Sequence, residues 1–206
     1  MEKYISKKEK ASYGFAAVGS YMVAGITQSY LMYFFTDILI IPSAFVMMLM
    51  IVARVWDALN DPMMGVIVDR TSTKYGKMRP YVLIGSFLML VTTIVLFMPL
   101  TGAPTMFKMI FAADSYIIFG MAYTLTDVPA MGLMSVATPN SDERASLLSF
   151  YVTVGSVGSL LPVGLLTIFQ SFIPEKYVYF AMSIFVGIIT SAAYLTLFKN
   201  SKKRFS

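Results

Sequence analysis

The chain has 206 residues, of which 57% are hydrophobic and 13% are charged, and it carries a formal net charge of +5. Soluble domains carry about 25% charged residues, so this composition favours a membrane protein. It contains no cysteine and no histidine, which excludes disulfides, thiol or imidazole catalysis and most transition-metal sites. The basic residues form short clusters between apolar runs, a pattern typical of membrane proteins, so no nucleic-acid partner is expected.

Six apolar segments are each long enough to cross a bilayer, which requires about 20 mostly apolar residues in a helix. The connections between them are short and several contain proline or glycine, so no extramembrane domain is expected. No removable signal peptide is expected either, because the charged first residues lead directly into a long span. The sequence therefore predicts an all-α membrane protein, a single bundle of six transmembrane helices over residues 1–206, at residues 12–35, 44–68, 81–100, 109–136, 147–169 and 177–198.

The lysines and arginines are distributed unevenly about these spans. Of the 16, thirteen fall on one side, Arg54 lies inside the second span, and only Lys108 and Lys176 fall on the other side. Basic residues beside membrane spans are retained in the cytoplasm. The pattern predicts a multi-pass protein of the cell (inner or plasma) membrane with both termini in the cytoplasm.

The second segment, ARVWDALNDPMMGVIVDR (residues 53–70), is apolar but carries four polar side chains at spacings of three and four: Arg54, Asp57, Asn60 and Asp61. In a helix these residues share one face. Each charge at bilayer depth costs at least ~2.5–3.5 kcal/mol on insertion scales. The face is therefore expected to point into the bundle or a wet cavity, where ionisable residues are functional by default.

This cluster is suited to holding one positive charge. Pro62 cannot donate to the Ala58 carbonyl, which frees a further oxygen beside the carboxylates of Asp57 and Asp61. Hard oxygens suit a small alkali cation, and a carboxylate pair can also hold a proton. The alternative is an internal ion-pair network in which Arg54 neutralises one aspartate and locks helix packing, which leaves one carboxylate over.

Ahead of the third segment, a basic loop follows the second span. Asp69 can pair with a basic residue of this loop or of a neighbouring helix, and such a pair can act as a latch that one conformation makes and another breaks. The alternative is simple anchoring by the positive charges. The candidate residues for this gating network are Arg54, Asp69, Arg70, Lys77 and Arg79.

The fourth segment carries a second polar cluster in mid-span. Tyr123 and Asp127 are four residues apart, so they lie together on a helix and are placed to hydrogen-bond a polar solute. Thr124 either adds a hydroxyl oxygen to the cation site or bonds back to its own helix.

At these residues the chain resembles a known family. GVIVDR (65–70) followed by GKMRP (76–80) resembles the loop between helices two and three of the major facilitator superfamily. ARVWDALNDPMMGVIVDRT (53–71) and FGMAYTLTDVPAMGLM (119–134) resemble, more narrowly, the glycoside–pentoside–hexuronide:cation symporters, the melibiose permease-like family. The resemblance covers nearly the whole chain, but only the amino-terminal six-helix half of the family.

The resemblance implies a fold of three plus three helices and the symport of a sugar or glycoside with sodium or a proton. It implies no cofactor. It assigns cation binding to Asp57, Asn60, Asp61 and Thr124, and Asp57 and Asp61 are the acidic ligands of an alkali cation. It assigns solute binding to Tyr123 and Asp127, and Tyr21 and Gln28 are further candidates. The expected partners are the lipid bilayer, a small-molecule solute and a second six-helix half, which is absent from this sequence and belongs either to the same chain, if truncated, or to a partner chain.

Several sugar contacts of the family do not carry over. Ser20 and Tyr21 stand where the family has a charged pair, and Met131 and Val152 stand where it has a tryptophan and an arginine. This keeps open a symporter of an amphipathic, lipid-like solute. A non-transporting sensor or scaffold built on the half-bundle is the other alternative. An enzyme is not expected, because the aspartate pair lies on one helix and no serine triad is evident.

Overall fold

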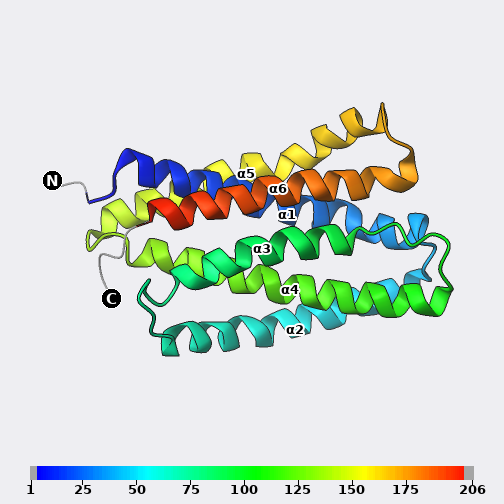
Figure 1. Ribbon diagram of the computed structural model, residues 1–206, viewed down its shortest axis with the longest axis horizontal. Helices are drawn as coiled ribbons and strands as arrows, with labels where there is room; N and C mark the ends of the chain where they lie inside the picture. Colours follow the sequence, from blue (N-terminus) through cyan, green and yellow to red (C-terminus); the bar gives the residue numbers. More distant parts are fainter. Residues whose placement is uncertain (1–3, 202–206) are drawn as a thin grey trace.

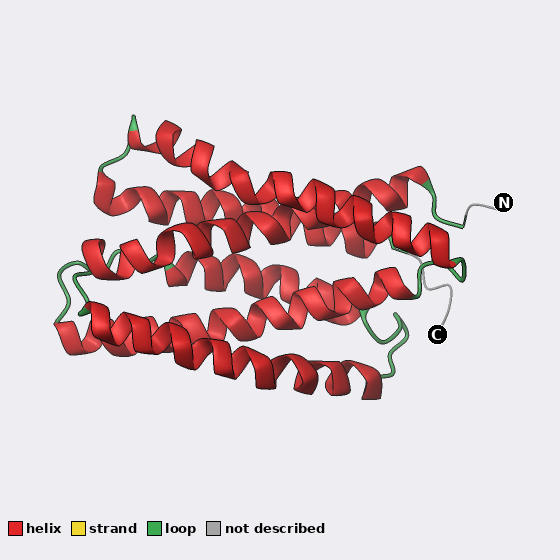
Figure 2. Ribbon diagram, turned by 180° about the vertical axis from the view of Figure 1, so that it is seen from behind, coloured by secondary structure: helices red, strands yellow, loops and turns green. Residues whose placement is uncertain are grey.

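The computed structural model describes residues 4–201, and regular structure in this range is entirely helical. Six α-helices run roughly along the long axis of the molecule (Figure 1), and Figure 2 shows the same helices from behind, with loops only at the two ends. The helices are α1 (Lys7–Tyr33), continued by the π-helix η1 (Phe34–Ile38), then α2 (Ser43–Arg70), α3 (Arg79–Leu96), α4 (Thr105–Ser135), α5 (Ser141–Gln170) and α6 (Glu175–Asn200).

The all-α fold and the six helices of the sequence prediction are confirmed, but most predicted bounds are too short. Helices α1 and α5 begin earlier because polar residues cap them: the side chain of Ser6 accepts from the backbone N–H of Glu9, and that of Asn140 accepts from Asp142 and Glu143. Hydropathy misses such a polar first turn, although capping residues mark it. Helix α3 instead ends at Leu96, short of the predicted residue 100.

Five of the helices, α2 to α6, are long and apolar enough to cross a membrane. Helix α1 is not among them, although the sequence predicts six spans. It is rich in small and hydroxyl-bearing residues, and 14 of its 27 residues are buried, compared with five of 28 in α2. Helix α1 therefore meets other helices on most sides, where polar atoms find partners within the protein.

The packing places α1 against α5 and α6, α3 against α4 and α6, and α2 against α4. At two points α1 and α5 approach so closely that only glycine fits. A Cβ atom on Gly158 would lie 2.8 Å from the carbonyl oxygen of Val18, and one on Gly25 would lie 2.5 Å from that of Ser159. Helices α1 and α5 thus form a tight pair, while α2 is held on one side by α4.

The connection from η1 to α2 fixes where α2 starts. Ile40 has φ 58°, a left-handed conformation that β-branched residues rarely adopt. The preceding carbonyl, of Leu39, accepts a 2.9 Å hydrogen bond from Nζ of Lys108, a buried residue in the first turn of α4. This bond ties the start of α2 to the start of α4, the two helices that carry the predicted polar clusters.

Two apolar clusters fill the bundle, and a polar layer lies between them. One cluster includes Met22, Phe34 and Met182, and the other includes Ala17 and Tyr194. Ser20, which is fully buried, lies between the clusters along α1. The predicted solute residues of α4 reach this same level.

Candidate functional site

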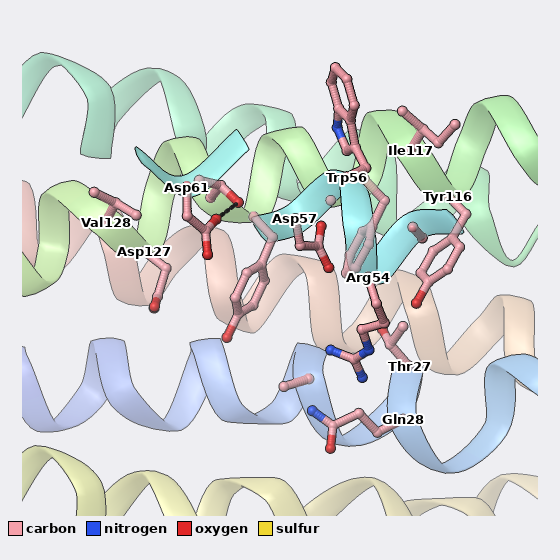
Figure 3. Close-up of a pocket in the computed structure, with 16 residues that line it drawn as sticks. Thr27, Gln28, Arg54, Trp56, Asp57, Asp61, Tyr116, Ile117, Asp127 and Val128 are labelled. Carbon is pink, nitrogen blue, oxygen red and sulfur yellow. Dashed lines mark hydrogen bonds between the residues drawn. The ribbon is translucent and has the colours of Figure 1, made fainter. Parts of the chain in front are cut away.

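A cavity of about 270 Å³ lies among α1, α2 and α4. Its lining combines polar side chains from all three helices, shown in Figure 3, and includes Thr27, Gln28, Arg54, Trp56, Asp57, Asp61, Tyr116, Gly120, Tyr123, Thr124 and Asp127. Most of the residues predicted separately as cation and solute ligands therefore share one cavity.

The carboxylates of α2 meet the backbone and a hydroxyl of α4. The Thr124 hydroxyl, which is buried, donates to Oδ1 of Asp61 across 2.8 Å. It therefore bonds across the helix interface and not back to its own helix. A Cβ atom on Gly120 would lie 3.2 Å from Oδ1 of Asp57. The Asp57 carboxylate therefore packs closely on α4 at a glycine, which has no side chain to push it away.

Arg54 lies on the cavity wall but does not neutralise the aspartates by direct pairing. Within residues 4–201, no salt bridge joins Arg54 to Asp57 or Asp61. Its guanidinium reaches toward Gln28 of α1 (Figure 3). The ion-pair network considered from the sequence is thus not formed, and among residues 4–201 both carboxylates are without a direct basic partner.

Asn60 is the one predicted cation ligand that does not line the cavity. Successive residues of a helix are about 100° apart, so Arg54 and Asp61 fall on one flank of Asp57, while Asn60 falls on the other with Trp56. The Nδ2 atom of Asn60 and Nε1 of Trp56 are both buried without a hydrogen-bond partner. The structure therefore brings together Asp57, Asp61 and Thr124, and its geometry gives no support to Asn60 as a ligand.

The solute candidates of α4 form a hydroxyl-rich cluster with α1 and α6. Ser20 Oγ lies 3.0 Å from Asp127 Oδ1 and 3.1 Å from the hydroxyl of Tyr123. The hydroxyl of Tyr194 also donates to Asp127 Oδ1, across 3.5 Å. Asp127 points from α4 toward α1 (Figure 3), and among the described residues no salt bridge joins it to a lysine or arginine.

Of the two solute candidates on α1, only one lines the cavity. Gln28 is exposed and lines the cavity. Tyr21 does not; its ring packs edge to face on Tyr151 with centroids 6.2 Å apart, and against Gly155 of α5. The sequence reasoning missed Thr27, which lines the cavity one residue from Gln28, and Ser20. Their spacing of seven residues, two helical turns, was a signal that could have found this face.

The predicted gating residues are not joined to one another in the part of the chain that the structure describes. Asp69, Arg70 and Lys77 are exposed, and no ion pair is found among them. Arg79 is instead tied to α6: its Nη2 donates to the carbonyl oxygen of Phe198 at 2.7 Å, and the guanidinium lies 4.8 Å from the centre of the Phe198 ring. The structure thus holds Arg79 in a helix-to-helix contact.

The cation candidates that line the cavity, Asp57, Asp61 and Thr124, offer oxygen ligands. Among residues 4–201, no group of three or more acidic side chains is placed to hold a metal ion. Two carboxylates and a hydroxyl remain on the α2–α4 wall. Mg²⁺ and Ca²⁺ are hard cations that take six to eight oxygen ligands, more than the five oxygen atoms that these three side chains carry.

Known sugar-transport proteins and symporters are similar to this chain in sequence. Residues 12–206 match the family model described as MFS/sugar transport protein. The uncharacterized symporter YjmB of Bacillus subtilis is 37% identical over 161 residues, which cover 77% of this chain and 35% of YjmB. The inner membrane symporter YicJ of Escherichia coli is 34% identical over 76% of this chain and 34% of its own length.

A third relative aligns over nearly all of the chain. The putative glycoside/cation symporter YagG of Escherichia coli is 30% identical over 206 residues, 98% of this chain and 44% of YagG. The chain therefore spans less than half the length of these curated relatives.

Proposed function

The chain belongs to the MFS/sugar transport protein family, and from this premise we propose that it forms the amino-terminal half of a cation-coupled secondary transporter for a sugar or glycoside. The observation that carries the proposal is the shared cavity: Asp57 and Asp61, candidates for the cation, and Tyr123 and Asp127, candidates for the solute, line it together. The name of YagG, a putative glycoside/cation symporter, supports the same pairing of solute and ion.

Coupling follows from the charges of this cavity. Two carboxylates on one wall, with no directly paired base, repel each other, and a sodium ion or a proton between Asp57 and Asp61 relieves that repulsion. Thr124 brings its hydroxyl oxygen to the same wall, bonded to Asp61. A cation bound here would hold α2 against α4 and so shape the surface around Tyr123 and Asp127. By linkage, the solute then raises cation affinity by the same factor.

We propose that all six helices span the membrane as two repeats of three. In such a repeat, α1, α2 and α3 correspond to α4, α5 and α6. The packed pair α1–α5 then corresponds to α4–α2, and the packed pair α1–α6 corresponds to α4–α3. The pairs α4–α2 and α4–α3 are also packed in the structure. Inverted repeats with a site at their interface are common in secondary transporters. The start of α1 and the end of α6 lie at the same end of the bundle (Figure 1), and the basic clusters support a cytoplasmic location for that end.

A second six-helix half, in the same chain or in a partner chain, would cover the face of the bundle on which α2 and α5 are exposed. Helix α2 exposes Val52, Val55 and Leu59 beside the cavity residues, and α5 exposes Val157 and Leu160. Only five residues of each helix are buried. Rocking of the two halves about the site would expose it to each side of the membrane in turn.

The test is transport in vesicles. The chain is reconstituted with its second half, and uptake of a panel of glycosides and lysolipids is measured with an imposed sodium or proton gradient. Accumulation of a glycoside that requires one of these gradients is the expected result. Uptake that ignores both gradients contradicts coupling, and uptake restricted to lysolipids contradicts the solute class.

A further inference from the structure

Ser20 joins the two solute candidates without lining the cavity itself. It is fully buried on α1, and its Oγ lies 3.0 Å from Asp127 Oδ1 and 3.1 Å from the hydroxyl of Tyr123. Both of these partners line the cavity. The orientation of the single proton on Ser20 therefore decides what they can offer to a bound molecule.

The protons of this cluster can be assigned by counting. When Asp127 is ionised its carboxylate can only accept hydrogen bonds, and a serine hydroxyl has one proton. Ser20 donates that proton to Asp127. The remaining contact, between Ser20 and Tyr123, then requires the phenol to donate to Ser20 Oγ. The result is a directed chain from Tyr123 through Ser20 to Asp127, with Tyr194 as a second donor to the same Asp127 oxygen.

With this direction, Tyr123 and Asp127 offer only acceptors to the cavity. The proton of Tyr123 is committed to Ser20, so its oxygen can only accept from a ligand. Asp127 keeps its second oxygen, Oδ2, which also only accepts. A ligand group that itself only accepts would leave these groups unpaired on binding, which is costly away from water.

We propose that Ser20 is a positioning residue that makes this end of the cavity select solutes with free hydroxyl donors. The substrate class is a neutral sugar that presents two adjacent hydroxyls, one to Asp127 and one to Tyr123. Ether, fluoro and carboxylate groups are rejected at these positions, the last also because a like charge would face Asp127. The inference rests on the proposed transport function, since it specifies the solute of the same site.

The sequence provides a reporter for binding. Trp56 is the single tryptophan and lines the cavity, so its fluorescence can follow occupancy in the purified chain. The probes are methyl β-D-glucopyranoside, methyl β-D-xylopyranoside and methyl β-D-galactopyranoside, each compared with its monodeoxyfluoro analogues. Fluorine is close to a hydroxyl in size but cannot donate a hydrogen bond.

We expect fluorine at two adjacent positions to weaken binding about tenfold or more, a loss of the size found when a hydrogen-bonding site meets an analogue without the donor. In Ser20→Ala the Tyr123 proton is released, so the loss at one of these positions should fall to about threefold or less. The control is Ser86→Ala, because Ser86 is equally buried but bonds only to Leu83 of its own helix at 2.7 Å. Equal losses in wild type and Ser20→Ala, or full affinity of the fluoro analogues in wild type, would overturn the inference.

A second measurement does not need a ligand. The C–O stretching band of the Tyr123 phenol is isolated as the infrared difference between wild type and Tyr123→Phe, with ring-labelled tyrosine. A hydrogen-bond-donating phenol in wild type, whose band moves in Ser20→Ala but not in Ser86→Ala, is the expected result. If the Tyr123 phenol instead accepts a hydrogen bond, the inference about Ser20 is overturned, and the proposed transport function is unaffected. If no glycoside is transported in vesicles, the proposed transport function fails, so the two failures are distinguishable.

Discussion

The hydroxyl of Thr124 donates a 2.8 Å hydrogen bond to Oδ1 of Asp61, and this bond joins the middle of α4 to the polar face of α2. The residue before Thr124 is Tyr123, which together with Asp127 lines the cavity. One short stretch of α4 therefore carries a contact to the cation candidates on one side and the solute candidates on the other. We therefore expect a change at one site to reach the other through this helical turn.

Replacing Thr124 with valine tests the first of these contacts. The change keeps the shape of the side chain but removes the donor to Asp61 and one candidate oxygen ligand. We expect the apparent cation affinity to fall about 10–100-fold, the usual effect of losing a partner that orients a ligand, with solute uptake still activated at high cation concentration. Uptake at varied sodium concentration and pH gives the value. Thr126→Val is the matched control, because Thr126 bonds to Ala122 of its own helix.

Asp61→Asn should uncouple the ion from the solute. The substitution removes one of the two charges that a cation would balance, so solute exchange is expected to continue while uphill accumulation driven by an ion gradient is lost. Asp114→Asn is a suitable control, since Asp114 is an exposed acid on α4 that does not line the cavity. Normal coupling in Asp61→Asn would contradict the assignment of the cation site.

The sequence predicts the helices and the polar faces well because each depends on local spacing. The positions of Asp57 and Asp61 on one face, and of Tyr123 and Asp127 on another, follow from the helical period alone. That the two faces meet in one cavity depends on how α2 packs on α4. The tie from Lys108 to the Leu39 carbonyl is part of that packing and has no local signature.

The helical period also cannot tell which of several residues on one helix face take part in the site. Asn60 shares the spacing pattern with Asp57, yet it does not line the cavity. Arg54 lies three residues before Asp57 on the same face, yet within the described residues no salt bridge joins it to Asp57 or Asp61. Ser20 carries no charge, and its spacing of seven residues from Thr27 is a weak signal beside its contacts with Tyr123 and Asp127 of α4.

Gly158→Ala should destabilise the α1–α5 pair. The added methyl group would lie 2.8 Å from the carbonyl oxygen of Val18, and a backbone atom cannot move aside as a flexible side chain can. Overpacking of this kind costs about 1–3 kcal/mol, which should appear as a lower melting temperature in detergent. Gly164→Ala on the same helix meets nothing within 4 Å and should be neutral or slightly stabilising. Equal melting temperatures for the two variants would show that α1 and α5 are not in this contact.

Arg79→Gln should loosen the end of α6. The guanidinium donates to the Phe198 carbonyl and covers the Phe198 ring, and a glutamine replaces neither contact fully. Hydrogen exchange of the last turn of α6 is expected to quicken. Lys77→Gln serves as the control, because Lys77 is exposed. Unchanged exchange in Arg79→Gln would indicate that the contact is formed in only part of the transport cycle and that Arg79 serves the gating role considered from the sequence.

Asp127→Asn separates solute binding from cation binding. Asp127 Oδ1 accepts from both Ser20 and Tyr194, and an asparagine can keep those two bonds only by turning its NH₂ group toward the solute. The cavity surface then presents a donor where it had an acceptor, so solute affinity should fall about tenfold or more. The response of Trp56 fluorescence to sodium or to pH should persist, because Asp57, Asp61 and Thr124 are unchanged. Loss of both responses together would mean that Asp127 belongs to the cation site, and the division of the cavity into two neighbouring sites would have to be abandoned.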